Sequence, residues 1–310
     1  MTRRRSSHAF VCTLTLLLAN AWPGLAQMGQ PFYVGGELGA AFSHGVTVVG
    51  DSNDRASVCD EFINPDFASV PGCTDLARGV GDNWSVPFGG TLGRVSSAVI
   101  GVRLLPMARV EAEYVTRTSD YSENSPILAA AGVNADKLSN ELFLAEEWLG
   151  IVSSANLMGN VYLDLPDIIP DATPFVGFGV GIGRTKADYA SVWSRSTDPA
   201  DITTGRELPN ANEIARNLAG TSSSARATME DTQFSYQLLA GFDYALGDDV
   251  SMVVRGRWLA VGEFAGKLVW DPLRSHAPNL RLDRSEPVDG TMTTDDFSYA
   301  SLSVGLKYHF

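Results

Sequence analysis

The sequence predicts an all-β protein: an eight-stranded antiparallel, up-and-down transmembrane β-barrel with four long extracellular loops. Apolar and polar residues alternate along eight segments of about ten residues or more, the length that a tilted strand needs to cross a bilayer. Short and long connections alternate between these segments, as in barrels with short turns at one end and long loops at the other. No run of about 20 apolar residues occurs, so no transmembrane helix is expected.

The composition supports a membrane β-barrel and argues against a nucleic-acid-binding protein. The chain has 310 residues, 36 acidic against 23 basic, and a formal net charge of −13. A nucleic-acid-binding protein would need a basic face to displace counterions from phosphates, so no nucleic-acid partner is expected. Glycine is frequent, at 30 residues, which suits the crowded interior of a narrow barrel.

The first 26 residues are typical of a cleaved signal peptide. Arg3, Arg4 and Arg5 form a positive start, a short apolar stretch follows over 10–19, and Gly24 to Ala26 offer small residues for cleavage. The alternative, a membrane anchor, is disfavoured because the apolar stretch is too short. We therefore expect a signal peptide over 1–26 and an outer-membrane barrel domain over 27–310.

The eight segments expected to be strands are 32–42, 91–104, 108–118, 149–165, 174–185, 232–244, 250–259 and 297–310. Short turns are expected at 105–107, 166–173 and 245–249, and long loops at 43–90, 119–148, 186–231 and 260–296. With an even strand number and both termini in the periplasm, every long loop is extracellular. Apolar residues at helical spacing over 138–149 predict a short helix in the second long loop.

The contents of the two strand faces separate a membrane barrel from a soluble one, which alternation alone leaves open. Aromatic residues gather at strand ends, as interfacial girdles require, and the polar face is rich in glycine. We therefore predict that the apolar face meets lipid and that the polar face forms an interior closed by ion pairs and small waters. A register error of one residue would exchange the faces of a segment. The predicted interior charges are Glu37, Arg103, Arg109, Glu111, Glu113, Asp164, Asp243, Arg255, Arg257 and Lys307, with Arg117 on the same face.

Cys59 and Cys73 remain after signal cleavage and lie in one polar segment. Export to an oxidising compartment favours a disulfide between them over two free thiols. A metal site is not expected, because two cysteines without a nearby histidine are an incomplete ligand set. No cofactor is expected either.

The C-terminus resembles the insertion signal of bacterial outer-membrane proteins, which the barrel-assembly machinery recognises. Ser303, Gly305, Tyr308 and Phe310 carry this pattern. The stretches 109–114 (RVEAEY), 158–164 (MGNVYLD), 173–181 (TPFVGFGVG) and 234–244 (FSYQLLAGFDY) resemble strand motifs of the opacity-protein-like and bacterial surface-antigen barrels. The resemblance implies a surface-exposed barrel in the outer-membrane lipid, with roles in adhesion, antigenicity or envelope integrity, and it implies no catalytic residues.

Three functions can be compared on these grounds. The first is a non-enzymatic surface barrel whose loops contact an unidentified surface ligand, and the alternative is a small porin, which the balanced interior charges disfavour. The third is an outer-membrane enzyme, which needs a base beside a nucleophile or water. His44 and His276 could meet at the outer rim, but no motif supports a site there. We expect His309 to be packed in the last strand, and Glu111 and Glu113 to be structural because arginines keep them ionised.

Overall fold

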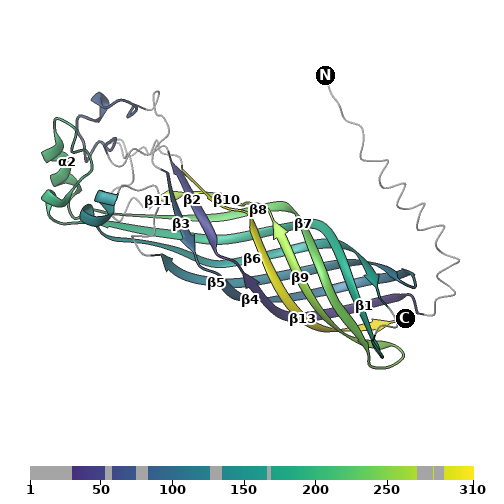
Figure 1. Cartoon of the computed structure of the whole chain (residues 1–310). Helices are drawn as coiled ribbons and strands as arrows, with labels where there is room; N and C mark the ends of the chain where they lie inside the picture. Colours follow the sequence, from purple (N-terminus) through teal and green to yellow (C-terminus); the bar gives the residue numbers. More distant parts are fainter. Residues whose placement is uncertain are drawn as a thin grey trace, which may run out of the picture.

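The computed structural model describes residues 30–52, 58–74, 83–125, 135–165, 169–270, 282 and 290–310. The predicted signal peptide and His276 lie outside these residues. Within the described part of the chain, no helix has the length and apolar character needed to cross a bilayer. Among these residues the fold is all-β, and the one α-helix they contain is short and lies far from both described ends of the chain (Figure 1).

The strands are β1 (Phe32–Ser43), β2 (Val46–Ser52), β3 (Asn83–Phe88), β4 (Thr91–Leu105), β5 (Ala108–Ser125), β6 (Leu142–Asp164), β7 (Ala172–Arg195), β8 (Ser222–Ala245), β9 (Val250–Val261), β10 (Ala265–Lys267), β11 (Val269–Trp270), β12 (Gly290–Thr294) and β13 (Phe297–His309). The helical elements are two 3₁₀ turns (Phe67–Ser69 and Pro199–Asp201), a π-helical turn (Lys137–Glu141) and α2 (Ala211–Leu218).

Eight of these strands close a barrel. Each pairs antiparallel with its neighbour in the order β8-β7-β6-β5-β4-β1-β13-β9, and the β8–β9 pairing closes the ring. The first and last strands pair along their length, from Tyr33 opposite His309 to Ser43 opposite Tyr299. Closure leaves no open edge among these strands, which is the condition for a sheet to cross lipid. The predicted eight-stranded up-and-down barrel is confirmed.

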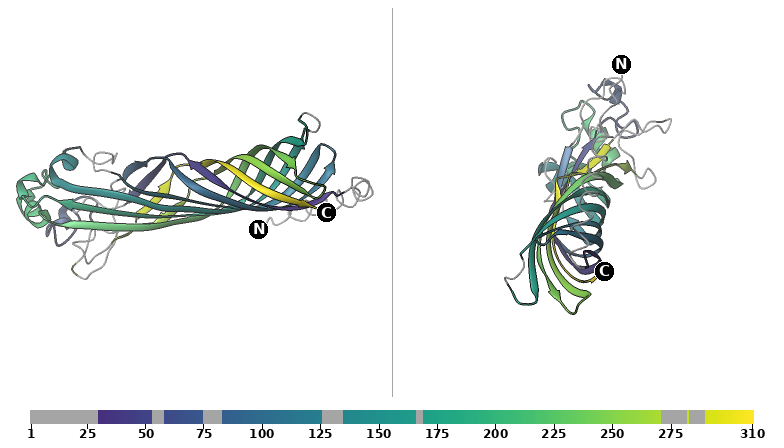
Figure 2. Two further views of the ribbon diagram at one scale, coloured as in Figure 1. Left: turned by 90° about the horizontal axis from the view of Figure 1, so that it is seen from below. Right: turned by 90° about the vertical axis from the view of Figure 1, so that its right-hand side faces the viewer.

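The two ends of the barrel differ. At one end, which we call the turn end, short connections join β4 to β5 and β8 to β9, and Gln30 and Phe310 lie there too. At the other end, which we call the head end, β6, β7 and β8 reach 23, 24 and 24 residues, while β1 and β9 stop at 12. The molecule is therefore elongated, with the long strands forming an extension on one side of the barrel (Figure 2).

The short strands of the barrel continue as a second sheet. The order in this sheet is β10-β12-β2-β3. Each of these strands is joined by a short bend to one barrel strand: β10 to β9, β12 to β13, β2 to β1 and β3 to β4. The second sheet therefore repeats the barrel order β9-β13-β1-β4. The bends lie at 43–46, 88–91, 261–264 and 294–297, where buried or inward-directed positions fall three residues apart instead of two. Such a shift bends a strand and reverses which parity faces inward.

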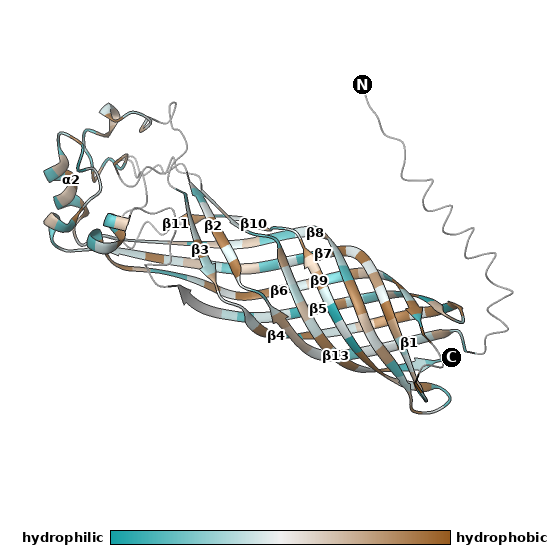
Figure 3. Cartoon of the chain, in the orientation of Figure 1, coloured by the Kyte–Doolittle hydropathy of each residue, from teal (hydrophilic) through white to brown (hydrophobic). Residues whose placement is uncertain are grey.

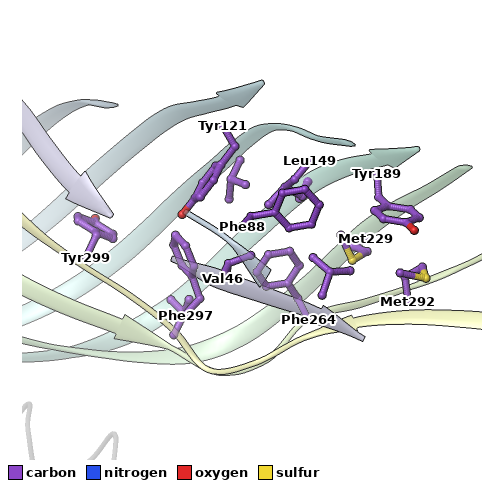
Figure 4. Packing of buried hydrophobic residues seen from close by; sticks show 14 of the residues in the cluster. Val46, Phe88, Tyr121, Leu149, Tyr189, Met229, Phe264, Met292, Phe297 and Tyr299 are labelled. Atoms are coloured by element: carbon purple, nitrogen blue, oxygen red, sulfur yellow. The ribbon is translucent and has the colours of Figure 1, made fainter. Parts of the chain in front are cut away.

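An apolar core fills the space between this second sheet and the long strands. Val46, Phe88 and Met292 from the second sheet pack with Leu149, Tyr189 and Met229 from β6, β7 and β8 (Figure 4). At the head end the barrel therefore flattens into a two-layer sandwich. We call β2, β3, β10 and β12 the small sheet, and the head-end parts of β5 to β8 the large sheet.

Three expectations from the sequence are corrected by the structure. The helix expected over 138–149 is wrong beyond its first turn, because β6 begins at Leu142. Register shifts at 142–144 and 149–152 place the buried apolar residues of this stretch at 142, 145, 149 and 152, a spacing that imitates a helix, while Glu147 also faces inward. The long loops 43–90 and 260–296 contain the small sheet, and the loop 186–231 is shortened by the extensions of β7 and β8.

Candidate functional site

The outer face of the barrel carries an apolar band that ends at a definite level. On β7 the outward residues Val176, Phe178, Val180 and Ile182 are exposed and apolar, and the next outward residues along the strand are Arg184, Lys186 and Asp188. The same change occurs on β8 between Phe234 and Thr232, directly opposite Ile182 and Arg184. Figure 3 shows brown segments recurring along the barrel strands between white and teal ones, as expected for strands with one apolar face.

The height of this band approaches the apolar band of about 25 Å that outer-membrane barrels present to lipid. From Pro174 to Ile182 a strand rises about 26 Å along its axis at roughly 3.3 Å per residue, or about 20 Å along the barrel axis at a tilt of about 40°. Leu38 illustrates the exposure of the band: its side chain is 73% exposed although it is fully apolar. A closed barrel with such a band satisfies its backbone hydrogen bonds and its surface only in lipid. This chain is an outer-membrane β-barrel.

Comparisons with known proteins find distant structural likenesses and no sequence relative. No protein-family model matches the chain, and no curated protein matches its sequence. Among solved structures, Neisserial surface protein A is similar at 11% identity and a TM-score of 0.39, over 90% of this chain and 97% of that chain. The outer membrane protein OprG from Pseudomonas aeruginosa has the same values.

The outer membrane protease OmpT from Escherichia coli is similar at 10% identity and a TM-score of 0.33, over 89% of this chain and 97% of that chain. At such identities and TM-scores the likeness transfers no activity to this chain.

The interior of the membrane-spanning part holds a network of charges around Arg255. This side chain is fully buried and forms ion pairs with Glu37 and Glu111, both at 3.0 Å, and with Glu113 at 3.3 Å. Arg257 also binds Glu113. Because β1, β5 and β9 supply these groups from different sides of the barrel, the network ties opposite walls together across the lumen.

Neutral donors complete the hydrogen bonding of the carboxylates. The hydroxyl groups of Tyr33 and Tyr162 donate to Glu111 at 3.0 and 2.8 Å. The side-chain amides of Asn160 and Gln237 donate to Glu113, both at 3.0 Å. A buried ion pair is tolerated when such partners replace the lost water, so the network fits a closed lumen.

A second layer of charges lies nearer the turn end. Lys307 donates to Asp243 at 2.8 Å, and Arg109 pairs with Asp243 and, at 3.4 Å, with Asp164. The guanidinium of Arg109 stacks over the rings of Tyr162 and Phe175, both at 4.6 Å. The lumen is thus blocked by two successive charged layers.

The lumen leaves no room for added side chains at its glycines. A Cβ atom built on Gly183 would lie 1.7 Å from Oδ1 of Asn156, and one on Gly101 would lie 2.1 Å from the Tyr33 ring. These positions need glycine because neighbouring strands direct large side chains over them.

The structure places nearly all of the predicted charges in the interior. Glu37, Arg109, Glu111, Glu113, Asp164, Arg255, Arg257 and Lys307 are buried. Asp243 is partly exposed at the turn end. The position predicted for Arg103 is corrected in part: its side chain is 40% exposed at the rim of the turn end, where it lies 3.7 Å from Asp164.

A vestibule of about 630 Å³ opens at the turn end, and its lining includes Arg103, Asp243, Ser251 and His309. His309 Nε2 lies 3.0 Å from the hydroxyl oxygen of Ser251, and its ring packs beside Tyr33 at 5.6 Å. Of the C-terminal signal residues, Ser303 faces inward and donates to Glu37 at 2.7 Å, while Tyr308 and Phe310 are exposed on the lipid-facing side. Gly305 lies opposite Glu37 on β1.

The head-end extension ends in a folded unit that we call the head, formed by residues 58–74 and 196–221. Cys59 and Cys73, which are 14 positions apart in the sequence, form a disulfide. Ile63 packs with Ile202, Ile214 and Leu218 in a small core. The side-chain amide of Asn217 donates to the Ile63 carbonyl at 2.9 Å, so two segments distant in sequence fold as one unit.

Glu141 anchors the head to β6. This buried carboxylate accepts hydrogen bonds from the backbone N–H groups of Thr203 (3.0 Å) and Thr204 (2.9 Å), and it pairs with Arg195 at 2.9 Å. Burial acts to raise the pKa of Glu141, but nearby Lys137 and Arg195 and the threonine hydrogen bonds outweigh it and hold the pKa below its usual value. The ionised carboxylate is therefore the form that holds the head in place.

Sequence reasoning missed the sandwich and the head, although β8 carries the signal. Over 234–244 the apolar residues occupy even positions and face outward, whereas over 225–229 Ala225, Ala227 and Met229 occupy odd positions and are buried. In lipid the apolar residues of a barrel strand face outward, and in water they face inward. A strand on which the apolar residues change from even to odd positions therefore passes from lipid into water. Among the described residues, no group of three or more His, Cys, Asp or Glu is placed to hold a metal ion.

Proposed function

We propose that this chain is a non-enzymatic surface barrel that carries a folded head for contact with an extracellular ligand or surface. The observation that carries the proposal is the position of the head. From Arg184 to Arg195, β7 continues for about 36 Å of strand length beyond the apolar band at roughly 3.3 Å per residue, and the head lies at its tip. A long, ordered extension with a crosslinked tip is suited to presenting a binding surface beyond the membrane.

The proposal includes an orientation. The head end is extracellular and the turn end, with both termini, is periplasmic, as in barrels with short periplasmic turns. The signal peptide over 1–26 is removed during export, the domain 27–310 enters outer-membrane lipid, and the barrel-assembly machinery recognises the C-terminal strand.

Closure of the lumen supports a role that does not depend on transport. The two charged layers fill the lumen of a barrel that is already narrow at eight strands. A small porin, the alternative function, would require these ion pairs to separate, which leaves buried charges without partners. We therefore expect no stable wide opening in a planar bilayer; such an opening would favour the porin.

Site-specific labelling of intact cells tests the orientation. Glu213 is exposed on α2 and Gly247 is exposed at the turn end, and the disulfide leaves no competing thiol at Cys59 or Cys73. A membrane-impermeant maleimide should label Glu213→Cys on intact cells, and Gly247→Cys only after the outer membrane is permeabilised. The reverse pattern would overturn the orientation.

Replacement of the head tests the contact role. A variant in which residues 199–219 are replaced by a short Gly-Ser linker keeps all eight barrel strands. Attachment of cells that carry this variant should fall below that of cells with the unchanged chain at equal surface amounts. Equal attachment would refute the contact role, and cleavage of peptide or lipid A by the purified barrel would refute the non-enzymatic one.

A further inference from the structure

One carboxyl group lies inside the sandwich, above the membrane and apart from the charged lumen. Glu147 is on the part of β6 that extends beyond the apolar band, and its side chain is only 2% exposed. It sits between Ala145 and Leu149, which are buried apolar residues of the same strand face. A carboxyl group is therefore placed where every neighbour on its own strand face is apolar.

Donors from two other strands surround this group. The Tyr189 hydroxyl donates to Oε2, and the Trp193 indole N–H donates to Oε1 at 3.1 Å. Both come from β7 of the large sheet. Trp84, on β3 of the small sheet, lies beside the same carboxyl group, and its indole N–H completes no hydrogen bond with the described residues. Glu147 thus lies at the contact between the two sheets.

The charge environment differs sharply from that of the luminal carboxylates. Tyr189 is the titratable group that faces Glu147 from β7, and the two indoles are neutral. Burial raises the pKa of Glu147 to about 7, although the hydrogen bonds from Tyr189 and Trp193 act in the opposite direction. Glu111, Glu113 and Glu141 by contrast have arginine partners.

The edge of the small sheet that carries Trp84 is linked to the barrel by bends, whereas the opposite edge is also held by strand pairing. The four bends include Gly45, Gly89, Gly90 and Gly262. At the opposite edge, β10 leads through Leu268 into β11, which pairs with β8. Trp84 packs closely over Gly50 of β2, where an added Cβ would lie 2.3 Å from the indole ring. A shift of β3 therefore moves β2 with it.

We propose that Glu147 is a proton-binding site that clamps the sandwich: the small sheet packs tightly on the large sheet when Glu147 is protonated, and it loosens when the carboxylate is ionised. A carboxylate without a cation is costly in an apolar core, and loosening lets water reach it. Protonation removes that cost and leaves Tyr189 as a hydrogen-bond partner of the carboxyl group. The extracellular contact surface thereby becomes sensitive to pH near neutrality.

The expected size of the effect follows from linkage. A solvated glutamate has a pKa of about 4.3, so the clamped state binds the proton more tightly than the loosened state. Stability of the clamp is then greatest at acid pH, falls as pH rises between the two pKa values, and is constant above the higher one. The ratio of loosened to clamped molecules should rise about tenfold between about pH 6 and about pH 8.5.

Amide hydrogen exchange of the folded full-length barrel in lipid vesicles tests the proposal. We expect protection of β3 amides, taken relative to β4 amides in the same sample, to fall about tenfold over this pH interval. In Glu147→Gln, which cannot ionise, the protection should be independent of pH. Glu146→Gln, the neighbouring outward position on the same strand, is the matched control and should behave as the unchanged chain does.

Tryptophan emission provides a second readout, since Trp84 and Trp193 lie at the carboxyl group. A transition with a midpoint near pH 7 should occur in the unchanged chain and in Glu146→Gln, and be absent from Glu147→Gln. If β3 protection is constant with pH in the unchanged chain, or if Glu147→Gln retains the change, the clamp does not exist. Gel mobility before and after heating shows that each variant is folded.

Discussion

Replacement of Arg255 by methionine should strongly destabilise the barrel, because this one side chain holds three carboxylates. Arg255 lies 3.0 Å from Glu37, 3.0 Å from Glu111 and 3.3 Å from Glu113. At an effective dielectric constant near 20, each such pair corresponds to about 5 kcal/mol of attraction. Much of this offsets the cost of burying the arginine, so the net loss expected when one partner of a buried network is removed is about 3–5 kcal/mol.

Urea unfolding of the barrel in lipid vesicles, followed by tryptophan emission, measures this loss. Arg184→Met is the matched control, because Arg184 is 68% exposed above the apolar band and its pair with Glu230 should contribute less than about 1 kcal/mol. The loss of unfolding free energy caused by Arg255→Met should be smaller near about pH 4, where glutamates begin to be protonated. If Arg255→Met unfolds within about 1 kcal/mol of the unchanged chain at neutral pH, the network does not stabilise the lumen in the way argued here.

Three further predictions concern the head and the lipid face. Replacing Cys59 and Cys73 by serine should cost about 3 kcal/mol of local stability, seen as faster proteolysis of 58–74 with unchanged heat-modifiable mobility; equal proteolysis would contradict it. Glu141→Gln should release the head at neutral pH. In the unchanged chain the pKa of Glu141 is depressed in the folded state, so the head should loosen only as pH falls below the usual glutamate pKa. Hydrogen exchange of the Thr203 and Thr204 amides measures both effects. On β8, Leu238→Arg should cost about 2–4 kcal/mol whereas Thr232→Arg, above the apolar band, should cost about 1 or less; equal unfolding free energies would show that the band is misplaced.

Much of the membrane-spanning part could be predicted from the sequence, because there the alternation of residues has one cause. Lipid selects for apolar side chains on every outward position, as in 234–244, and the narrow lumen selects for charge pairs and glycine on the others. The period of two then fixes each side chain's direction once a single register is known.

The sandwich could not be predicted by the same rule, because the rule reverses above the membrane. Ala225, Ala227 and Met229 lie on the face that is polar lower on the same strand. The shifts at 142–144 and 149–152 further disguise β6 as a helix. Partners such as Glu147 with Trp84, or Ile63 with Ile214, come from segments far apart in the sequence, and no local pattern links them.

Collision accessibility of spin labels placed along β13 in lipid vesicles shows most directly whether the apolar side chains of the barrel face lipid. Labels at 302, 304 and 306 should collide readily with oxygen dissolved in the bilayer, while a label at 303 should be shielded from it, because Leu302, Val304 and Leu306 are exposed on the outer face and Ser303 is buried in the lumen. A label at position 226, outward on β8 above the band, should collide instead with a water-soluble nickel complex. Oxygen accessibility that is highest at 303, or that does not alternate along β13, would contradict a barrel with its apolar side chains in lipid and its charges inside.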